Sequence, residues 1–247
     1  MRYTTQYLAS KNGYMIPYIC DIKDNEKKIV IVSHGFGSSK GSPTVKMLFD
    51  NLPQMGIGVV AYDFPNHGES AVQYDQLRIK NCIDDLEDIE KMILNKNKNC
   101  EIFYFSSSFG AYINLQYLSN REHCGTKSFV RSGAVNMSEL FQGTKDEEAQ
   151  LANRGYVELD YEPKITVSKE FIYDLRENDL FKIYKANKTE IKMVHGEMDE
   201  VIDIVAAIDF AEQNNIDITI VSNGDHSLSK ERMPQEVLEL AIDFFQG

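Results

Sequence analysis

Hydrophobic residues occur in short continuous runs that alternate with longer segments where they recur every three or four positions. The short runs are typical of strands buried on both faces of a parallel sheet, because such strands have no polar face. The longer segments are typical of amphipathic helices packed on that sheet. We predict strands at 28–33, 58–62, 102–105, 126–131, 190–195 and 217–222, and helices at 44–55, 77–95, 111–115, 201–214 and 235–245.

The alternation of strands and helices from residue 28 onward predicts a doubly wound, mostly parallel α/β sheet of about eight strands with right-handed crossovers. Residues 1–9 and 14–22 are predicted as two further strands joined at Lys11-Asn12-Gly13, since Asn-Gly is a strong hairpin signal. This hairpin would add antiparallel strands at one edge. The length of 247 residues suits a single domain, 1–247.

The segment 133–185 interrupts this alternation and is too long for one crossover. Long insertions in compact domains are usually functional, so we predict a cap over the strand ends, with a hairpin around 161–164. The alternative is a surface excursion that never contacts substrate. Four aromatic side chains of the segment could line a substrate pocket, or they could form the cap's own small core: Tyr156, Tyr161, Phe171 and Tyr173. We favour the second interpretation.

The net charge of −12 argues against a nucleic-acid partner and against an anionic membrane surface, both of which need clustered cations. Hydrophobic residues make up 43% of the chain, yet no apolar run approaches the roughly 20 residues of a membrane span. The N-terminus shows no signal-peptide pattern, so we expect a cytoplasmic location. The cysteines lack metal-site spacing and are expected to be reduced thiols: Cys20, Cys82, Cys100 and Cys124.

The most informative stretch is 100–115, where an apolar run turns sharply into a helix-like segment. A serine at this corner, with small residues two positions before and after it, fits the nucleophile elbow, usually written G-x-S-x-G. Here the pattern is Ser106-x-Ser108-x-Gly110. The alternative is an ordinary strand-to-helix loop whose hydroxyls cap the helix. The choice depends on whether partners for Ser108 follow other strands.

Two later loops supply such partners. A serine hydroxyl needs a base, and the loop after the last predicted strand offers His226. The imidazole in turn needs an acid to hold its tautomer, and the loop after 190–195 offers Asp199, with Asp203 in reserve. The alternative role for the acids of this loop is to cap the next helix. The order Ser108, Asp199, His226 is that of α/β-hydrolases and differs from other serine-hydrolase folds.

With these motifs in order, the chain resembles the α/β-hydrolase superfamily over essentially its whole length. The family's H-G-x loop is matched by 34–36, its G-x-x-D acid loop by 196–199 and its G-x-H loop by 224–226. Its D-x-x-G-H-G-x-S loop is similar to 63–70, with Asn66 in place of the usual glycine. The resemblance implies an oxyanion hole formed by the backbone N–H groups of Phe36 and Phe109. The remaining loop histidines are then structural: His34, His67 and His195.

The pattern is similar to that of bacterial carboxylesterases of the feruloyl and cinnamoyl esterase type. It also resembles monoglyceride lipases, acyl thioesterases and prolyl aminopeptidases. We therefore predict a serine hydrolase that cleaves a small or medium carboxylic ester through an acyl-enzyme, without metal or cofactor. The alternatives are a thioesterase or acyltransferase, a prolyl-aminopeptidase-like enzyme, and a non-enzymatic binding protein, which would not need an intact Ser, Asp and His. The sequence leaves acyl specificity and oligomeric state open.

Overall fold

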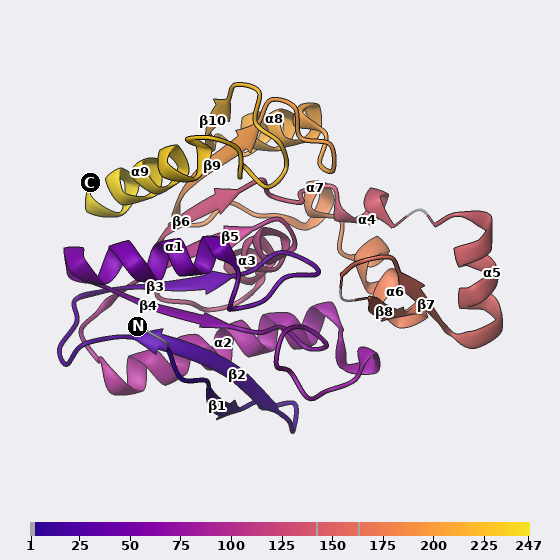
Figure 1. Cartoon of the computed structure of the whole chain (residues 1–247), viewed down its shortest axis with the longest axis horizontal. Helices are drawn as coiled ribbons and strands as arrows, with labels where there is room; N and C mark the ends of the chain where they lie inside the picture. Colours follow the sequence, from indigo (N-terminus) through magenta and orange to yellow (C-terminus); the bar gives the residue numbers. More distant parts are fainter. Residues whose placement is uncertain (1–2, 142, 163) are drawn as a thin grey trace.

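A single eight-stranded sheet forms the centre of the computed structural model, which describes residues 3–141, 143–162 and 164–247 (Figure 1). Its strand order is β1-β2-β4-β3-β5-β6-β9-β10. The bounds are β1 (Gln6–Ala9), β2 (Met15–Asp21), β3 (Lys28–Ser33), β4 (Ile57–Tyr62), β5 (Glu101–Ser107), β6 (Gly125–Arg131), β9 (Glu190–Gly196) and β10 (Asp217–Val221).

Six strands of this sheet, β4, β3, β5, β6, β9 and β10, pair in parallel, whereas β1 and β2 form the antiparallel hairpin at one edge. This confirms the predicted α/β-hydrolase architecture. The first strand is shorter than predicted and begins only at Gln6; residues 1 and 2 lie outside the described residues. The reason is that the Tyr3 ring instead packs on Phe49, with ring centroids 4.6 Å apart.

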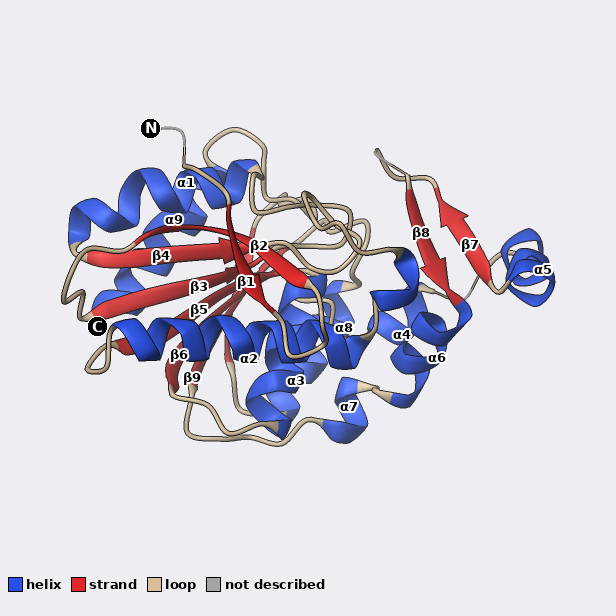
Figure 2. Ribbon diagram, turned by 90° about the horizontal axis from the view of Figure 1, so that it is seen from below, coloured by secondary structure: helices blue, strands red, loops and turns tan. Residues whose placement is uncertain are grey.

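Helices cover both faces of the sheet (Figure 2). On one face lie α1 (Pro43–Asn51) and α9 (Met233–Gln246), whose apolar residues form one core with β3, β4 and β5. On the other face lie α2 (Ile79–Lys96), α3 (Phe109–Asn120) and α8 (Ile204–Gln213). Both cores bury long aliphatic and aromatic side chains, and this burial is the main favourable contribution to folding. Within the described residues, no helix combines the length and apolar character needed to cross a bilayer.

Two of the differences between the predicted and observed helix boundaries have a clear physical cause. The first helix stops at Asn51 and continues as the 3-10 turn η1 (Leu52–Met55), because Pro53 cannot donate to an α-helical hydrogen bond. A second 3-10 turn, η2 (Tyr74–Gln76), precedes α2. Helix α8 begins at Ile204 rather than Val201, because the Asp199 carboxylate accepts the backbone N–H groups of Val201 and Ile202 and holds them in the loop.

The predicted insertion contains α4 (Met137–Leu140), α5 (Lys145–Arg154), β7 (Tyr156–Leu159), β8 (Ile165–Ser168), α6 (Lys169–Glu177) and α7 (Leu180–Ile183). Strands β7 and β8 pair antiparallel around the predicted turn; its Pro163 lies outside the described residues. Figures 1 and 2 show α5, β7, β8 and α6 beyond the carboxyl ends of the parallel strands. The insertion therefore stands where the loops with the candidate catalytic residues converge.

The four aromatic residues of the insertion have different environments, so neither sequence-based interpretation describes all of them. Phe171 is fully buried in a core continuous with that of the main sheet, not in a separate cap core. Tyr161 lines a cavity beside Ser108, whereas Tyr173 is 60% exposed. Tyr156 packs beside Tyr74. Phe171 and Tyr173 lie two residues apart on α6 and still differ completely in burial, which sequence spacing alone does not reveal.

Candidate active site

Ser108 occupies the sharp corner between β5 and α3. Its backbone angles, φ 50° and ψ −115°, are strained for a residue with a side chain. Gly110 must be glycine, because a Cβ there would collide with the carbonyl oxygens of Ser33 and His34. Ser106 stands where glycine is more usual, and it fits because its hydroxyl lies 3.5 Å from the Phe129 carbonyl oxygen on β6. The sequence thus forms the strained elbow despite the substitution.

A continuous hydrogen-bonded chain links the three side chains chosen from the sequence. His226 Nε2 lies 3.0 Å from Ser108 Oγ. On its other side, His226 Nδ1 lies 2.9 Å and 3.0 Å from the two carboxylate oxygens of Asp199. The Nδ1–H tautomer, donating to Asp199, leaves Nε2 free to accept the serine proton. The reserve acid, Asp203, instead caps α8 by accepting the Val205 N–H.

Asp199 is held as a buried anion. Its side chain is fully buried, and burial alone would raise its pKa. Hydrogen bonds from His226 and from the backbone N–H groups of Ile202 and Val201 outweigh that effect, so the pKa of Asp199 falls below its ordinary value. The group is therefore ionised at neutral pH and can stabilise an imidazolium at His226.

The other histidines near the site, two in loops and one near the end of β9, support the loops around it. Nε2 of His34 accepts the Phe64 N–H at 3.2 Å, and Nδ1 of His67 lies 2.9 Å from the Pro65 carbonyl oxygen. Nε2 of His195 lies 3.1 Å from the Ile202 carbonyl oxygen. Burial lowers the pKa of all three imidazoles, that of His67 to about 3, so they stay neutral at physiological pH. Within the described residues, no cluster of three or more His, Cys, Asp or Glu side chains could hold a metal ion.

Two backbone N–H groups beside Ser108 are the candidates for an oxyanion hole. Phe109 begins α3 directly after Ser108, where helix N–H groups have no intrahelical acceptor. Phe36 follows Gly35, at which a Cβ would lie 3.4 Å from that of Ser108. Neither Phe36 nor Phe109 donates its N–H to a backbone carbonyl in the described part of the chain. Both donors therefore remain available next to Ser108.

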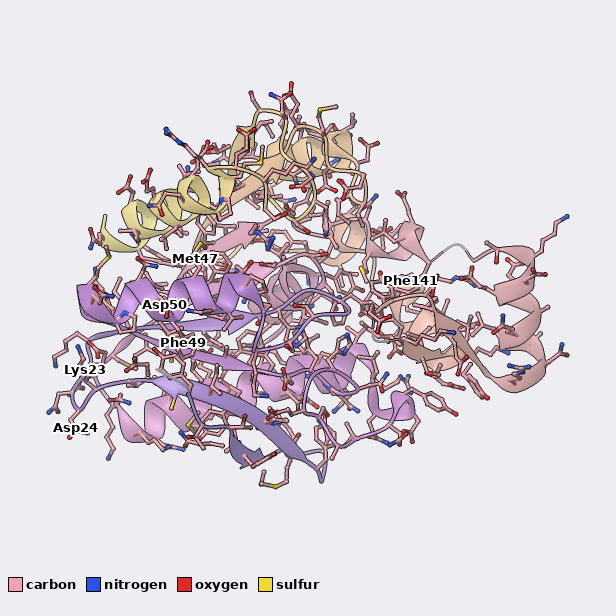
Figure 3. The ribbon with its side chains drawn as sticks, viewed as in Figure 1. Lys23, Asp24, Met47, Phe49, Asp50 and Phe141 are labelled. Carbon is pink, nitrogen blue, oxygen red and sulfur yellow. The ribbon has the colours of Figure 1, made fainter. Side chains whose placement is uncertain are left out.

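The ring of Phe36 joins the loop after β3 to the insertion. Its ring centroid lies 5.5 Å from that of Phe141, 5.3 Å from that of Tyr161 and 6.0 Å from that of Phe171. The first two pairs are edge-to-face and the third is stacked, and aromatic pairs of both kinds contribute beyond the area they bury. Figure 3 shows Phe141 where the cap joins the main body, at the end of the molecule opposite Lys23 and Asp24. The conformation of the loop after β3 thus depends on the cap.

Two cavities meet at Ser108. The larger, about 580 Å³, lies under the cap and is lined mainly by apolar side chains. The smaller, about 300 Å³, lies between the start of α1, the end of β6 and the loop that carries His226. Ser108, Phe36 and His226 line both cavities. A substrate bound at Ser108 can therefore extend in two directions.

A buried ion pair, which sequence reasoning missed, fixes the loop after β3. Lys40 is only 5% exposed, and its Nζ lies 2.6 Å from the Asp63 carboxylate. The same carboxylate accepts the backbone N–H groups of Lys40 and Glu69. In the loop after β4, which carries Asp63, Asn66 adopts a left-handed φ of 61°, which asparagine tolerates in place of the family's glycine, and its amide donates to the Thr166 carbonyl of β8.

Replacing Lys40 with methionine is expected to lower the free energy of unfolding by about 3–5 kcal/mol, because Asp63 is left as an unpaired buried charge. Lys46→Met is the matched control: that lysine also pairs with an aspartate, Asp50, but its side chain is 71% exposed. The control should cost less than about 1 kcal/mol. Urea denaturation of the three proteins measures both values. Equal losses for the two variants would show that the Lys40–Asp63 pair has no special structural role.

Comparison with known proteins places this architecture in a family. Residues 24–185 match the family model described as serine aminopeptidase, S33. This chain belongs to that family. The matched region includes Ser108 and the loop after β3. This chain is therefore a hydrolase with the α/β-hydrolase fold. A comparison with curated proteins found no match.

Solved structures share the whole fold at low sequence identity. A putative hydrolase from Agrobacterium vitis has a TM-score of 0.85 and 18% identity, covering 99% of this chain and 100% of that one. A soluble variant of monoglyceride lipase from Saccharomyces cerevisiae, in complex with a substrate analog, has a TM-score of 0.81 and 16% identity, and the match covers 100% of this chain and 95% of that one. Est1E from Butyrivibrio proteoclasticus with bound ferulic acid has a TM-score of 0.77 and 15% identity, and the match covers 98% of this chain and 100% of that one.

Proposed function

We propose that this protein is a serine hydrolase that cleaves a carboxylic ester through an acyl-enzyme. The observation that carries the proposal is the hydrogen-bonded chain from Ser108 Oγ through His226 to Asp199. A binding protein would gain nothing from a strained serine placed within 3.0 Å of an imidazole that a buried carboxylate orients. The names of the similar monoglyceride lipase and of the ferulic acid complex are consistent with ester chemistry.

The reaction has two halves. In the first, Ser108 Oγ attacks the ester carbonyl while His226 Nε2 takes its proton, and Asp199 stabilises the imidazolium. The Phe36 and Phe109 N–H groups bind the tetrahedral oxyanion, each donor being worth about 3 kcal/mol of barrier. His226 then protonates the leaving alcohol, and the C–O bond breaks. In the second half, His226 deprotonates water, which attacks the acyl-enzyme and releases the acid and Ser108.

The family description leads to one alternative, cleavage of an amide at the N-terminus of a peptide by the same three residues. Acidic side chains that could bind an α-amino group, Glu147 and Glu200, line the larger cavity. The two functions are separated by comparing 4-nitrophenyl esters with amino-acid 4-nitroanilides, alongside labelling by a fluorophosphonate. We expect labelling and ester turnover that exceeds anilide turnover. A protein that does not label would overturn both functions, and anilide turnover greater than ester turnover would favour the aminopeptidase.

Tyr161 tests whether the cap shapes the substrate pocket. Its ring lines the larger cavity and packs on Phe36 and against Gly37. Tyr161→Ala enlarges the cavity, so kcat/KM for bulky esters should rise relative to short ones by roughly 10-fold, the scale expected for hydrophobic pocket contacts. A panel of 4-nitrophenyl esters of increasing acyl length measures the ratio.

The matched control is Tyr173→Ala, which removes the same ring from the exposed side of α6. That variant should keep the wild-type ester profile, since its ring is 60% exposed. If Tyr161→Ala also keeps the wild-type profile, the cap is a surface excursion without contact with substrate.

A further inference from the structure

The smaller of the two cavities at Ser108 has more hydroxyl side chains in its wall than the larger one. Hydroxyl side chains gather along its wall, from the loop after β3, the start of α1 and the ends of β5 and β6. Its volume of about 300 Å³ is sufficient for a group of a few heavy atoms attached to the reacting ester. Such a lining favours a polar substrate group over a hydrocarbon chain, because burying hydroxyls against an apolar group leaves them without hydrogen bonds.

One cation, Arg131 at the end of β6, lines this cavity. Its guanidinium donates to Ser107 Oγ at 3.0 Å and to the Ser227 carbonyl oxygen. A guanidinium has five N–H donors, so these two bonds leave donors for a ligand. Burial lowers the pKa of Arg131 to about 10, and the group is still cationic at neutral pH. Among the described residues, no carboxylate lies within ion-pair distance of it.

The absence of an ion pair at Arg131 is informative in a chain with 38 acidic and 26 basic residues. Arg131 is partly buried, and taking a cation even partly out of water without a contacting counter-charge costs free energy. Here the neighbouring partners are a hydroxyl and a carbonyl, and the nearby acids that raise its pKa, Asp225 and Asp199, act only at longer range. The guanidinium thus has no carboxylate in direct contact, a place that a bound anion would take.

A second, independent observation comes from the next residue. Ser132 is 1% exposed, lines the same cavity, and its hydroxyl has no hydrogen-bond partner in the described part of the chain. Its backbone is held in the left-handed region, with φ 46°, by the Ser132 N–H bond to the Val194 carbonyl oxygen at 2.8 Å. An unpaired buried hydroxyl is costly unless a ligand satisfies it.

The nine-residue helix α1 begins at the same cavity. Its first residues, Pro43, Thr44 and Val45, contribute to the wall. A helix N-terminus carries a partial positive charge, which favours anions. Here Pro43 has no N–H and the Val45 N–H donates to Ser42 Oγ at 3.3 Å, so only Thr44 among these residues keeps an N–H for a ligand. The helix start, the cation and the unpaired hydroxyl therefore face one small space and share one ligand preference.

We propose that the substrate of this hydrolase carries an anionic group, a carboxylate or a phosphate, that binds in this cavity to Arg131 and the Ser132 hydroxyl. The proposal rests on the proposed function, because it places the reacting ester at Ser108. Planar guanidinium groups bind carboxylates and phosphates through paired hydrogen bonds, which gives both affinity and orientation. The neutral remainder of the substrate would occupy the apolar cavity under the cap.

The test compares esters matched in size but not in charge. For an anion in the acyl part, 4-nitrophenyl hydrogen glutarate is compared with 4-nitrophenyl valerate. For an anion in the alcohol part, 2-acetoxyethyl phosphate is compared with butyl acetate. We expect a higher kcat/KM for the anionic member of at least one pair. The arm that shows the preference tells whether the anion belongs to the acid or to the alcohol.

Arg131→Gln should lower the ratio of anionic to neutral kcat/KM by about 10- to 100-fold, the scale of charge-assisted hydrogen bonds. Arg154→Gln is the matched control, since it removes the same charge from the exposed end of α5 and should leave the ratio unchanged. Ser132→Ala should lower the ratio a few-fold. This variant decides the question if Arg131→Gln fails to fold, as judged by circular dichroism.

Other outcomes would overturn the inference. If neither pair of esters shows a preference for the anionic member, Arg131 only positions the His226 loop through Ser227. The same conclusion follows if Arg131→Gln lowers kcat/KM equally for the anionic and the neutral ester. If no ester is cleaved, the proposed function fails, and calorimetric titration of wild type and Arg131→Gln with glutarate and with inorganic phosphate decides separately. Binding by wild type alone would support an anion site at Arg131, and no binding by either protein would exclude it.

Discussion

Ser108→Ala is expected to lower kcat for ester hydrolysis by a factor of about 10⁶ and to abolish labelling by a fluorophosphonate. The loss should be this large because no other group near His226 can form the acyl-enzyme, which leaves only binding and the two backbone donors. Folding should be preserved, since the Ser108 hydroxyl is bonded to His226 and to no structural group. Initial rates with a 4-nitrophenyl ester, together with circular dichroism, measure both effects.

Ser106→Ala is the matched control for this variant. Ser106 is fully buried two residues before the corner, and its hydroxyl makes only a long bond to the Phe129 carbonyl oxygen. Most of the activity should remain. A fully active Ser108→Ala enzyme would mean that another residue is the nucleophile and that the elbow has been misassigned.

Asp199→Asn should lower kcat by about 10⁴, because the amide can donate to His226 Nδ1 and so favour the tautomer that cannot accept the Ser108 proton. KM should change much less, since the Asp199 side chain is fully buried behind His226. Steady-state kinetics on the same ester separate kcat from KM. The loop should keep its conformation in this variant, because the amide oxygen of the asparagine can still accept the Val201 and Ile202 N–H groups.

Asp203→Asn provides the matched control, because asparagine caps a helix about as well as aspartate. Its carboxylate bonds to the Val205 N–H, so activity and stability should stay close to those of wild type. If Asp203→Asn loses activity while Asp199→Asn keeps it, the acid that orients His226 during turnover is Asp203, and the geometry of the resting protein is misleading.

Much of the fold could be predicted from the sequence because its determinants are local. A strand buried on both faces must be apolar throughout, so β3, β4 and β5 stand out as continuous runs. The elbow could be located because strain and close packing impose small residues at fixed positions, as the contact of Gly110 with the carbonyls of Ser33 and His34 illustrates. The side chains of Ser108, Asp199 and His226 could be selected because each follows a strand, and parallel strands end at one edge.

The features that escaped prediction depend on distant contacts. Nothing near Lys40 in the sequence indicates that its charge meets Asp63 on another loop. From sequence alone, a lone arginine at a strand end, such as Arg131, is expected to be a solvated residue. Only the folded structure shows that it lines the same cavity as the unpaired Ser132 hydroxyl. Within the cap, a local signal was present: Thr144 and Glu147 form a capping box that marks the start of α5.

The packing of Phe36 has a consequence for how this fold diversifies. One residue supplies a backbone N–H beside Ser108 and a side chain enclosed by Phe141, Tyr161 and Phe171 of the insertion. The insertion is therefore not an interchangeable module: a transplanted cap with differently placed aromatic residues would shift the main chain that we propose binds the oxyanion. New specificities in this lineage are expected to arise by substitutions within an existing cap, or by exchange of the cap together with the loop after β3.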